Sequence, residues 1–250
     1  MIEDIKKIYR GCFASKETIS SFLACLPSFS NKELKICDIG GGQGFLLDQV
    51  RKFYKDKGYK VNCWIVDYNK EQLKLAPPYF HKVYKNALEF YKENFFDLII
   101  MRSVLQFLLS KDDKIKVLSN IYKSLKLNGY FINQALFLEK PDNRIIERAF
   151  RYFNRFLKID ALNSLINIYS MSRFKNCKIK TFCPISVIDK YDIQERFDLK
   201  DVIIDKIFSL FNENKNQLNS IEVEENNFKI RISFVILEAR KQIISNNRPA

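Results

Sequence analysis

The sequence predicts an α/β fold in which helices cover both faces of a doubly wound, mostly parallel sheet of seven strands. Three observations support this prediction. A glycine-rich run follows a short apolar strand near the start of the chain. Strand-like and helix-like segments then alternate up to about residue 138, as is typical of parallel sheets with helical crossovers. Two further strand-like segments near the end of the chain predict an antiparallel hairpin.

The glycine-rich run reads KICDIGGGQG, over residues 35–44. An apolar strand that carries Asp38 leads into the glycines, and the apolar-periodic segment 45–53 predicts a helix after them. The glycines at every second position are Gly40, Gly42 and Gly44. They let the backbone approach a ligand closely, with the amide groups of the helix start facing it. A dinucleotide fingerprint would need glycine at Phe45, and the Gly-Lys-Ser/Thr of a P-loop is absent.

The remaining core elements follow from apolar runs and from the residues that stop them. The nearly continuous apolar segment 95–101 is typical of a buried parallel strand, and Pro77-Pro78 ends the short helix before it. Asn128-Gly129 is expected to end the longest helix of this part. The other expected strands are 60–66, 82–85 and 130–137, and the expected helices are 2–10, 16–27, 69–76, 112–125 and 201–213.

The alternation stops after residue 138, which predicts an added segment. Residues 139–200 are expected to form a helical substrate-recognition insert after the fifth strand. The core then comprises 1–138 and 201–240, with the terminal hairpin at 221–224 and 228–239. Residues 241–250 are expected to be a flexible tail.

Composition limits the class of protein. The net charge of +13 favours an anionic partner unless the lysines are simply spread over solvated faces. The six cysteines form no C-x-x-C pair and there is one histidine, so no metal site is expected. We expect reduced cysteines, a cytoplasmic protein and no membrane span.

The motifs in this order resemble those of class I S-adenosylmethionine-dependent methyltransferases of the small-molecule type, which have a Rossmann-like core. The resemblance covers about residues 34–138 and the final hairpin. It begins with the acid and the G-x-G-x-G run, and continues with Asp67 at the end of the second strand. Asn86-Ala87 stands where the family often has Asp-Ala, and the run 103–108 resembles its VLHHL segment with Gln106 for the first histidine.

The resemblance implies that S-adenosylmethionine is the cofactor and that the carboxylate of Asp67 accepts both ribose hydroxyls. The implied cofactor-binding residues are Asp38, Gly40, Gly42, Gly44, Asp67, Tyr68, Asn86, Ala87, Arg102 and Ser103. The residues expected near the substrate are Tyr9, Phe13, Gln106, Gln134 and Phe153. No catalytic base is assigned, since the single histidine, His81, precedes the third strand and should lie away from the cofactor.

The expected reaction is methyl transfer to an oxygen of a small metabolite, with carbon or nitrogen as alternative acceptor atoms. A carrier-bound acyl group, RNA, or a regulatory protein without turnover remain as alternatives. Pro77-Pro78-Tyr79-Phe80 precedes the third strand instead of following the fourth, which argues against methylation of base amines. The chain also lacks a recognisable basic RNA-binding appendage, so nucleic acid is not the expected partner.

Four arginines recur at helical spacing in the added segment: Arg144, Arg148, Arg151 and Arg155. On one helix they would form a stripe opposite an apolar face. Such a stripe is either a solvated surface or a docking site for an acidic carrier protein.

Overall fold

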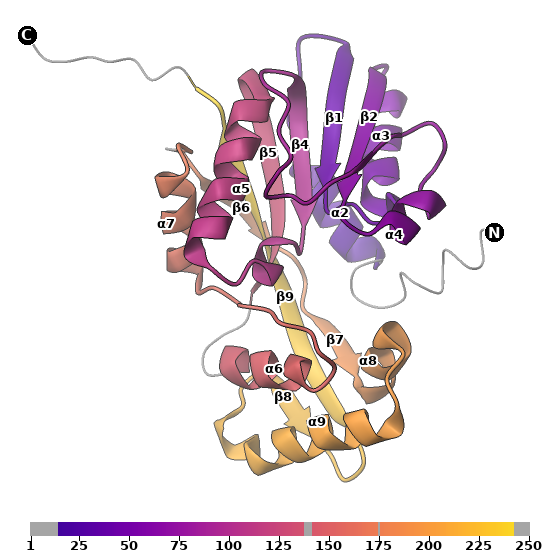
Figure 1. Ribbon diagram of the computed structural model, residues 1–250, viewed down its shortest axis with the longest axis vertical. Helices are drawn as coiled ribbons and strands as arrows, with labels where there is room; N and C mark the ends of the chain where they lie inside the picture. The colour runs from indigo at the N-terminus through magenta and orange to yellow at the C-terminus, as the bar shows by residue number, and fades with distance from the viewer. Residues whose placement is uncertain (1–14, 138–141, 175, 243–250) are drawn as a thin grey trace, which may run out of the picture.

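The computed structural model describes residues 15–137, 142–174 and 176–242. Its main sheet has the strand order β3-β2-β1-β4-β5-β9-β6 (Figure 1). The strands are β1 (Glu33–Ile39), β2 (Lys60–Asp67), β3 (His81–Tyr84), β4 (Phe96–Arg102), β5 (Leu125–Phe137), β6 (Lys178–Phe182) and β9 (Phe228–Arg240). The first five are mutually parallel, and β9 runs antiparallel to both of its neighbours. The predicted fold class is confirmed.

Both faces of the sheet are buried, as its sequence pattern requires. Along β4, Leu98 and Ile100 point into one apolar cluster, while Ile99 and Met101 point into the other. The first cluster includes buried side chains of α2 (Lys16–Ala24), α3 (Phe45–Asp56) and α4 (Lys70–Leu75). The second includes those of α5 (Lys111–Ser124) and α7 (Leu162–Met171). A strand with two apolar faces is therefore covered by helices on both sides.

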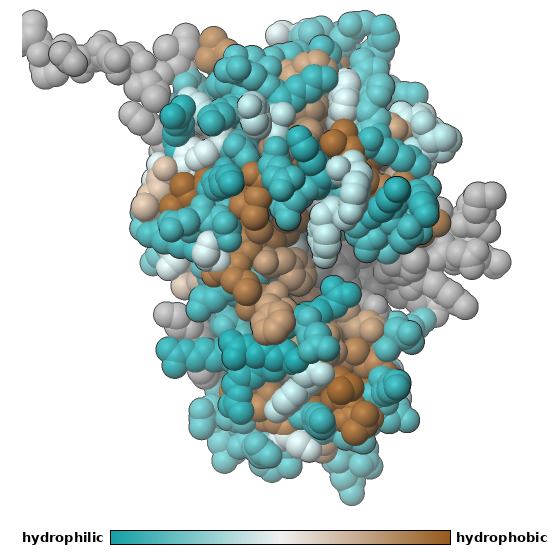
Figure 2. All heavy atoms as spheres, in the orientation of Figure 1, coloured by the Kyte–Doolittle hydropathy of each residue, from teal (hydrophilic) through white to brown (hydrophobic). Residues whose placement is uncertain are grey.

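A lower lobe extends the sheet along β9. Residues 233–240 of β9 pair with β5, whereas residues 228–232 pair with β7 (Ser186–Asp189) and β8 (Ile221–Val223). The helices α6 (Asp142–Arg151), α8 (Lys190–Phe197) and α9 (Asp201–Glu213) complete this lobe (Figure 1). In the space-filling view, apolar side chains gather where the lobe meets the main sheet (Figure 2). The two parts also share one apolar cluster, so they pack as a unit.

Three expectations need correction in detail. The seventh strand of the main sheet is β6, which lies within the segment expected to be a helical insert. Helix α5 ends at Ser124 and β5 follows at once. Asn128-Gly129 is therefore an irregularity inside β5, where Asn128 has a φ of 64° and donates its N–H to the carbonyl of Lys241.

The prediction that four arginines share one helix is wrong for Arg155. Helix α6 ends at Arg151, and Asn154 then takes a φ of 56°. The N–H of Arg155 turns back to the carbonyl of Phe150 at 3.1 Å, which is the geometry of a left-handed helix end. Arg155 therefore lies outside the helix, with its guanidinium over the ring of Phe197.

The helix expected at 2–10 and the tail beyond residue 242 lie outside the described residues. Lys241, expected in the tail, instead donates its N–H to the carbonyl of Gly129 at 3.0 Å. None of the helices in the described part of the chain is long and apolar enough to cross a membrane.

The contact of the glycine loop with Val104 gives a first testable prediction. A Cβ on Gly40 would stand 2.3 Å from Cγ2 of Val104, whereas a Cβ on Gly58 would meet nothing within 4 Å. Both glycines have positive φ, 71° and 76°, so alanine strains the backbone equally at the two positions. We expect Gly58→Ala to lower the unfolding free energy by about 1 kcal/mol. Gly40→Ala should cost about 1–3 kcal/mol more through overpacking.

Urea denaturation of the two variants measures this difference directly. Equal losses of stability would contradict the close approach of the loop to Val104.

Candidate functional site

The parallel strands β1, β2 and β4 end at one edge of the sheet, and the glycine loop crosses that edge. In the pairing register, Ile39 at the end of β1 lies beside Val66 of β2 and Met101 of β4. Asp67 and Arg102, the next residues on those strands, therefore flank the loop. Because β1 has β2 on one side and β4 on the other, the strand order reverses here, and such points bind ligands in open α/β sheets.

The glycine loop is held against the end of β2 by backbone hydrogen bonds. The N–H groups of Gly40 and Gly41 donate to the carbonyl of Val66 at 2.7 and 3.3 Å. Gly40, Gly42 and Gly44 all have positive φ, and Gly44 stands at the N-cap of α3. The loop thus has the backbone geometry that brings it close to a ligand without side chains in the way.

Asp67 is oriented by two backbone donors. Its Oδ2 accepts the N–H of Gly42 and its Oδ1 accepts the N–H of Asn69, both at 2.8 Å. The residue is 8% exposed. Each carboxylate oxygen keeps a further lone pair, so the fixed carboxylate can also accept hydroxyl groups of a ligand.

Asp38 lies beneath the loop, and it is 2% exposed. A Cβ on Gly41 would stand 2.9 Å from its carboxyl carbon, which shows how closely the loop covers it. Burial raises the pKa of Asp38 to about 7, against the lowering effect of the Arg102 charge and with a further rise from Asp67. A carboxyl in this state is poised to ionise when a cation arrives beside it.

The residues expected to contact adenine lie beyond Asp67 on the same edge. Tyr68 is 71% exposed. Asn86 follows β3, and its Oδ1 accepts the N–H of Leu88 at 3.0 Å. Ala87 is half-buried. The N–H of Lys85 donates to the carbonyl of Asp67, which joins the two segments.

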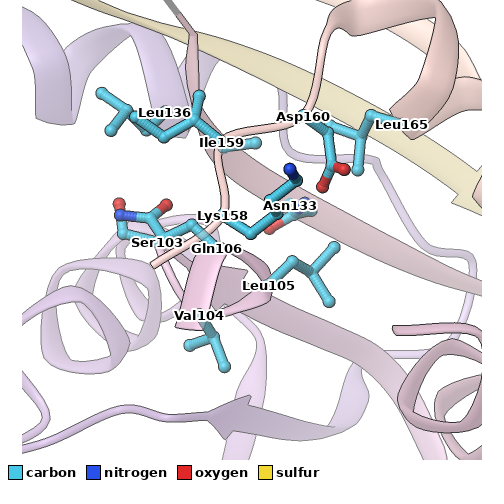
Figure 3. Close-up of a pocket in the computed structure, with 11 residues that line it drawn as sticks. Ser103, Val104, Leu105, Gln106, Asn133, Leu136, Lys158, Ile159, Asp160 and Leu165 are labelled. Atoms are coloured by element: carbon cyan, nitrogen blue, oxygen red, sulfur yellow. The ribbon is translucent and has the colours of Figure 1, made fainter. Parts of the chain in front are cut away.

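On the other side of the loop, a pocket opens at the ends of β4 and β5 (Figure 3). Val104, which packs on Gly40, belongs to its wall, so the pocket adjoins the glycine loop. The short helix η1 (Leu105–Phe107) carries Gln106 into the lining. The lining residues are Ser103, Val104, Leu105, Gln106, Asn133, Ala135, Leu136, Lys158, Ile159, Asp160 and Leu165.

Residues 158–160, which we call the strap, close one wall of this pocket. The N–H of Lys158 donates to the carbonyl of Gln106 at 2.6 Å. The ammonium of Lys114 donates to the carbonyl of Lys158 and forms an ion pair with Asp160. Glu147 of α6 accepts the N–H of Ile159 at 2.9 Å. The strap thus ties the lower lobe to η1 and α5.

Several polar groups in and behind the pocket are buried without partners. Neither Oδ1 nor Nδ2 of Asn133 has a hydrogen-bond partner within the described residues, and the same holds for Oγ of Ser103 and the hydroxyl of Tyr169. Burial raises the pKa of Tyr169 well above its ordinary value, with a smaller rise from Cys177 that the nearby Asn133 amide opposes. Buried polar groups of this kind are normally satisfied by a ligand or by water.

Other residues expected near the substrate lie elsewhere. Gln134 is fully buried on the opposite face of β5 from Asn133, and its Nε2 donates to the sulfur of Cys183 at 3.6 Å. Phe153 packs in the lower lobe, with its ring centroid 5.0 Å from that of Phe150 and 5.2 Å from that of Phe197. Tyr9 and Phe13 lie outside the described residues.

Sequence reasoning missed Asn133 and the pair Lys114–Asp160. A signal for Lys114 was present, because it shares the helical spacing of Val117, Leu118 and Ile121 and so stands on the buried face of α5. It is 1% exposed. The sequence shows Asn133 as a polar residue in an apolar strand, but it does not show which residues of other segments lie beside it.

Neither His81 nor a metal cluster adds to this site within the described residues. His81 begins β3 at the opposite end from the loop, where its ring stacks on Trp64 with centroids 4.4 Å apart. Among the described residues, no group of three or more histidine, cysteine, aspartate or glutamate side chains is placed to hold a metal ion.

Comparisons with known proteins agree with this arrangement. Residues 37–131 match the family model of a methyltransferase domain. A sequence search of curated proteins finds no match. Among solved structures, the YcgJ protein from Bacillus subtilis has a TM-score of 0.75 at 14% identity, over 90% of this chain and 98% of that chain.

Two further solved structures contain bound ligands. Phosphoethanolamine N-methyltransferase 2 from Haemonchus contortus, with phosphomonomethylethanolamine and S-adenosylhomocysteine, has a TM-score of 0.59 at 15% identity, over 97% of this chain and 57% of that chain. Geranyl diphosphate C-methyltransferase from Streptomyces coelicolor, with Mg²⁺, geranyl-S-thiolodiphosphate and S-adenosylhomocysteine, has a TM-score of 0.57 at 11% identity, over 89% of this chain and 74% of that chain.

The matched region runs from Cys37, beside the buried acid of β1, to Phe131 in β5. It therefore contains the glycine loop, the end of β2 and the first residues of the pocket wall. The match shows a methyltransferase domain over residues 37–131, and the solved structures show that the chain shares the fold of S-adenosylmethionine-dependent methyltransferases.

Proposed function

We propose that this methyltransferase acts on an oxygen of a small metabolite. The observation that carries the proposal is the enclosure of the pocket beside the glycine loop. Helix η1, the strap and Leu165 of α7 each form part of its wall, so the pocket is partly enclosed, which favours a small molecule over a polymer. Recesses with apolar walls and a few polar groups are the usual form of small-molecule sites.

The residues on the loop side fit the cofactor. The glycine loop leaves room for close approach, and we propose that Asp67 accepts the ribose hydroxyls while Asn86 and Ala87 border the adenine. Ionised Asp38 would favour the cationic part of the ligand from beneath the loop, with Arg102 balancing its charge. When bound, S-adenosylmethionine supplies an already activated methyl group, so the protein's main task is to orient the acceptor.

The charges around the pocket favour an oxygen acceptor. Asp160 is the one carboxylate among its lining residues, and Lys114 neutralises it. A protonated amine would find no free carboxylate there, whereas a hydroxyl group can hydrogen-bond to the amide and hydroxyl groups of the lining. The hydroxyl proton must leave when the oxygen–methyl bond forms, and we propose that it passes to solvent, because Lys114 already pairs with Asp160. The names of the Haemonchus and Streptomyces enzymes describe nitrogen and carbon acceptors on small molecules, which supports the size class of the substrate.

We also propose a cytoplasmic location. The five described cysteines, Cys25, Cys37, Cys63, Cys177 and Cys183, are free thiols, as is usual in a reducing compartment.

The role of Asp67 is tested by Asp67→Ala. Loss of hydrogen bonds to a charged acceptor should weaken cofactor binding by about 1–3 kcal/mol, or roughly 5- to 150-fold in Kd. Calorimetric titration with S-adenosylhomocysteine measures the change, and circular dichroism checks the fold, since Asp67 also accepts the N–H of Gly42. Glu71→Ala is the control, because Glu71 is an exposed acid on α4 paired with Lys74. Unchanged affinity in a folded Asp67→Ala protein would contradict the assignment.

The buried carboxyl of Asp38 predicts a pH dependence of stability. Its pKa is about 7 in the folded protein and about 4 when unfolded. Between these values the folded state holds a proton that the unfolded state has released. The resulting stabilisation is complete below pH 4 and is lost as the pH rises to 7, at up to about 1.4 kcal/mol per pH unit.

Asp38→Asn cannot lose this proton. Its unfolding free energy, measured in urea from pH 5 to pH 7, should therefore rise relative to that of the parent as the pH increases. Parallel pH curves for the two proteins would show that Asp38 does not titrate in this range.

The small-metabolite proposal also predicts the behaviour of the arginines. Arg148 and Arg151 are exposed on α6 of the lower lobe, and carrier docking would require their charge. We expect the double reversal to glutamate to leave kcat/KM for a small substrate unchanged, with stability changes within about 0.5 kcal/mol. Activity should be compared on free and carrier-bound forms of one substrate at two salt concentrations. A preference for the carrier-bound form that disappears in the variant would establish the alternative.

A further inference from the structure

We infer that Asn133 recognises the methyl acceptor and restricts it to uncharged molecules that present a hydroxyl or carboxamide group. The inference rests on the proposed function, because it assigns the pocket beside the glycine loop to the acceptor. Nothing in the comparisons points to this residue.

The first argument is the state of the Asn133 side chain. It is 1% exposed and belongs to the pocket lining (Figure 3). Its amide lies near the hydroxyl of Tyr169, but neither of its polar atoms makes a hydrogen bond of good geometry within the described residues. A buried amide left without hydrogen bonds is unfavourable, so such a group is expected to gain partners from a bound molecule. Oγ of Ser103, on the same pocket wall, is in the same state.

The second argument is the chemistry that the amide selects. Nδ2 donates and Oδ1 accepts, so Asn133 complements a group that both accepts and donates. A hydroxyl or a carboxamide meets that requirement. A carboxylate offers no proton to Oδ1, and an ammonium offers no acceptor to Nδ2.

The third argument is the charge of the surrounding wall. Lys114 is 1% exposed and forms an ion pair with Asp160, so their opposite charges cancel beside the pocket. A charged acceptor would have to compete with one partner of this pair and leave the other buried and unpaired, which is costly. The rest of the wall comes from the polar residues Ser103 and Gln106, from Lys158, whose side chain is exposed to solvent, and from the apolar side chains of Leu105, Leu136, Ile159 and Leu165. The structure therefore assigns to this pocket an uncharged acceptor with an apolar body.

Four probes of equal chain length test this assignment at pH 7: 1-butanol, butyramide, butyrate and butylammonium. Saturation-transfer NMR on the full-length chain compares their binding to the parent and to Asn133→Leu and Asn133→Asp. We expect the parent to bind butanol and butyramide at least five-fold more tightly than the two ions. Asn133→Leu should lose binding of butyramide at least ten-fold, and Asn133→Asp should gain binding of butylammonium.

Two readouts separate recognition from a structural role. Affinity for S-adenosylhomocysteine should be the same in all three proteins, because Asn133 lines the pocket and is not among the residues proposed to hold the cofactor. Asn133→Leu should raise Tm by about 2–4 °C, since it replaces an unpartnered buried amide with an apolar side chain of similar shape.

Each contrary result has its own meaning. A lower Tm for Asn133→Leu with no probe binding to the parent would show that the amide only holds structural water, and would overturn the inference. Equal binding of all four probes would also overturn it, while leaving the small-metabolite function intact. If the parent bound no probe but methylated a carrier-bound four-carbon acyl group, the proposed function and the inference would both fail.

Discussion

The architecture depends on one strand, β9, which takes part in two sheets at once. Its second half pairs with β5 over residues 233–240 and also with β6, and its first half pairs with β7 and β8. A strand of 13 residues spans about 43 Å. Phe228 in the lower lobe and Phe234 and Ile236 in the main sheet are fully buried on the same strand. Because backbone hydrogen bonds anchor β9 at both ends, the lower lobe has a defined position over the carboxyl edge of the parallel strands.

The strap makes the second connection between the two parts, and it does so beside the pocket. Its backbone is bound by groups from η1, α5 and α6, and its Asp160 pairs with the buried ammonium of Lys114. Buried ion pairs add little net stability, but removing one partner leaves an uncompensated charge and is strongly destabilising. This pair is thus better understood as a device that fixes the position of the strap. A fixed strap gives the pocket a constant shape, which recognition by a single amide requires.

The cofactor edge shows how a small number of charges can be tuned by burial. Two carboxyl groups, Asp38 and Asp67, lie close enough to interact, and Arg102 balances them. Asp67 is held by two backbone N–H groups and keeps lone pairs for hydroxyls. Asp38 is nearly free of solvent contact, so burial is the largest influence on its pKa. The same residue type therefore has two different surroundings within one site.

The local patterns that the sequence contains were sufficient for the core of the fold. The strand, glycine loop and helix at 35–53, Asp67 at the end of β2, and the apolar strand β4 are all set by short-range periodicity and glycine spacing. Each of these patterns lies within a single element, because the apolar residues that an element buries recur along its own short sequence. The burial of Lys114 could also be predicted, because its position in the sequence falls on the buried face of α5.

Other features depend on contacts between distant segments. Strand β6 joins the sheet only because β9 offers it a free edge, and α6 ends before Arg155 because the chain turns back on Phe150. The partnership of Lys114 with Asp160 spans 46 residues, and the opposite orientations of Asn133 and Gln134 follow from the pleat of a strand whose two faces are both buried. The sequence by itself determined the α/β core and the glycine-loop edge of its sheet, because neighbouring residues specify both. Only the tertiary structure decided which polar side chains line the pocket beside the glycine loop, because they come from β5, η1 and the strap and meet only when these elements pack.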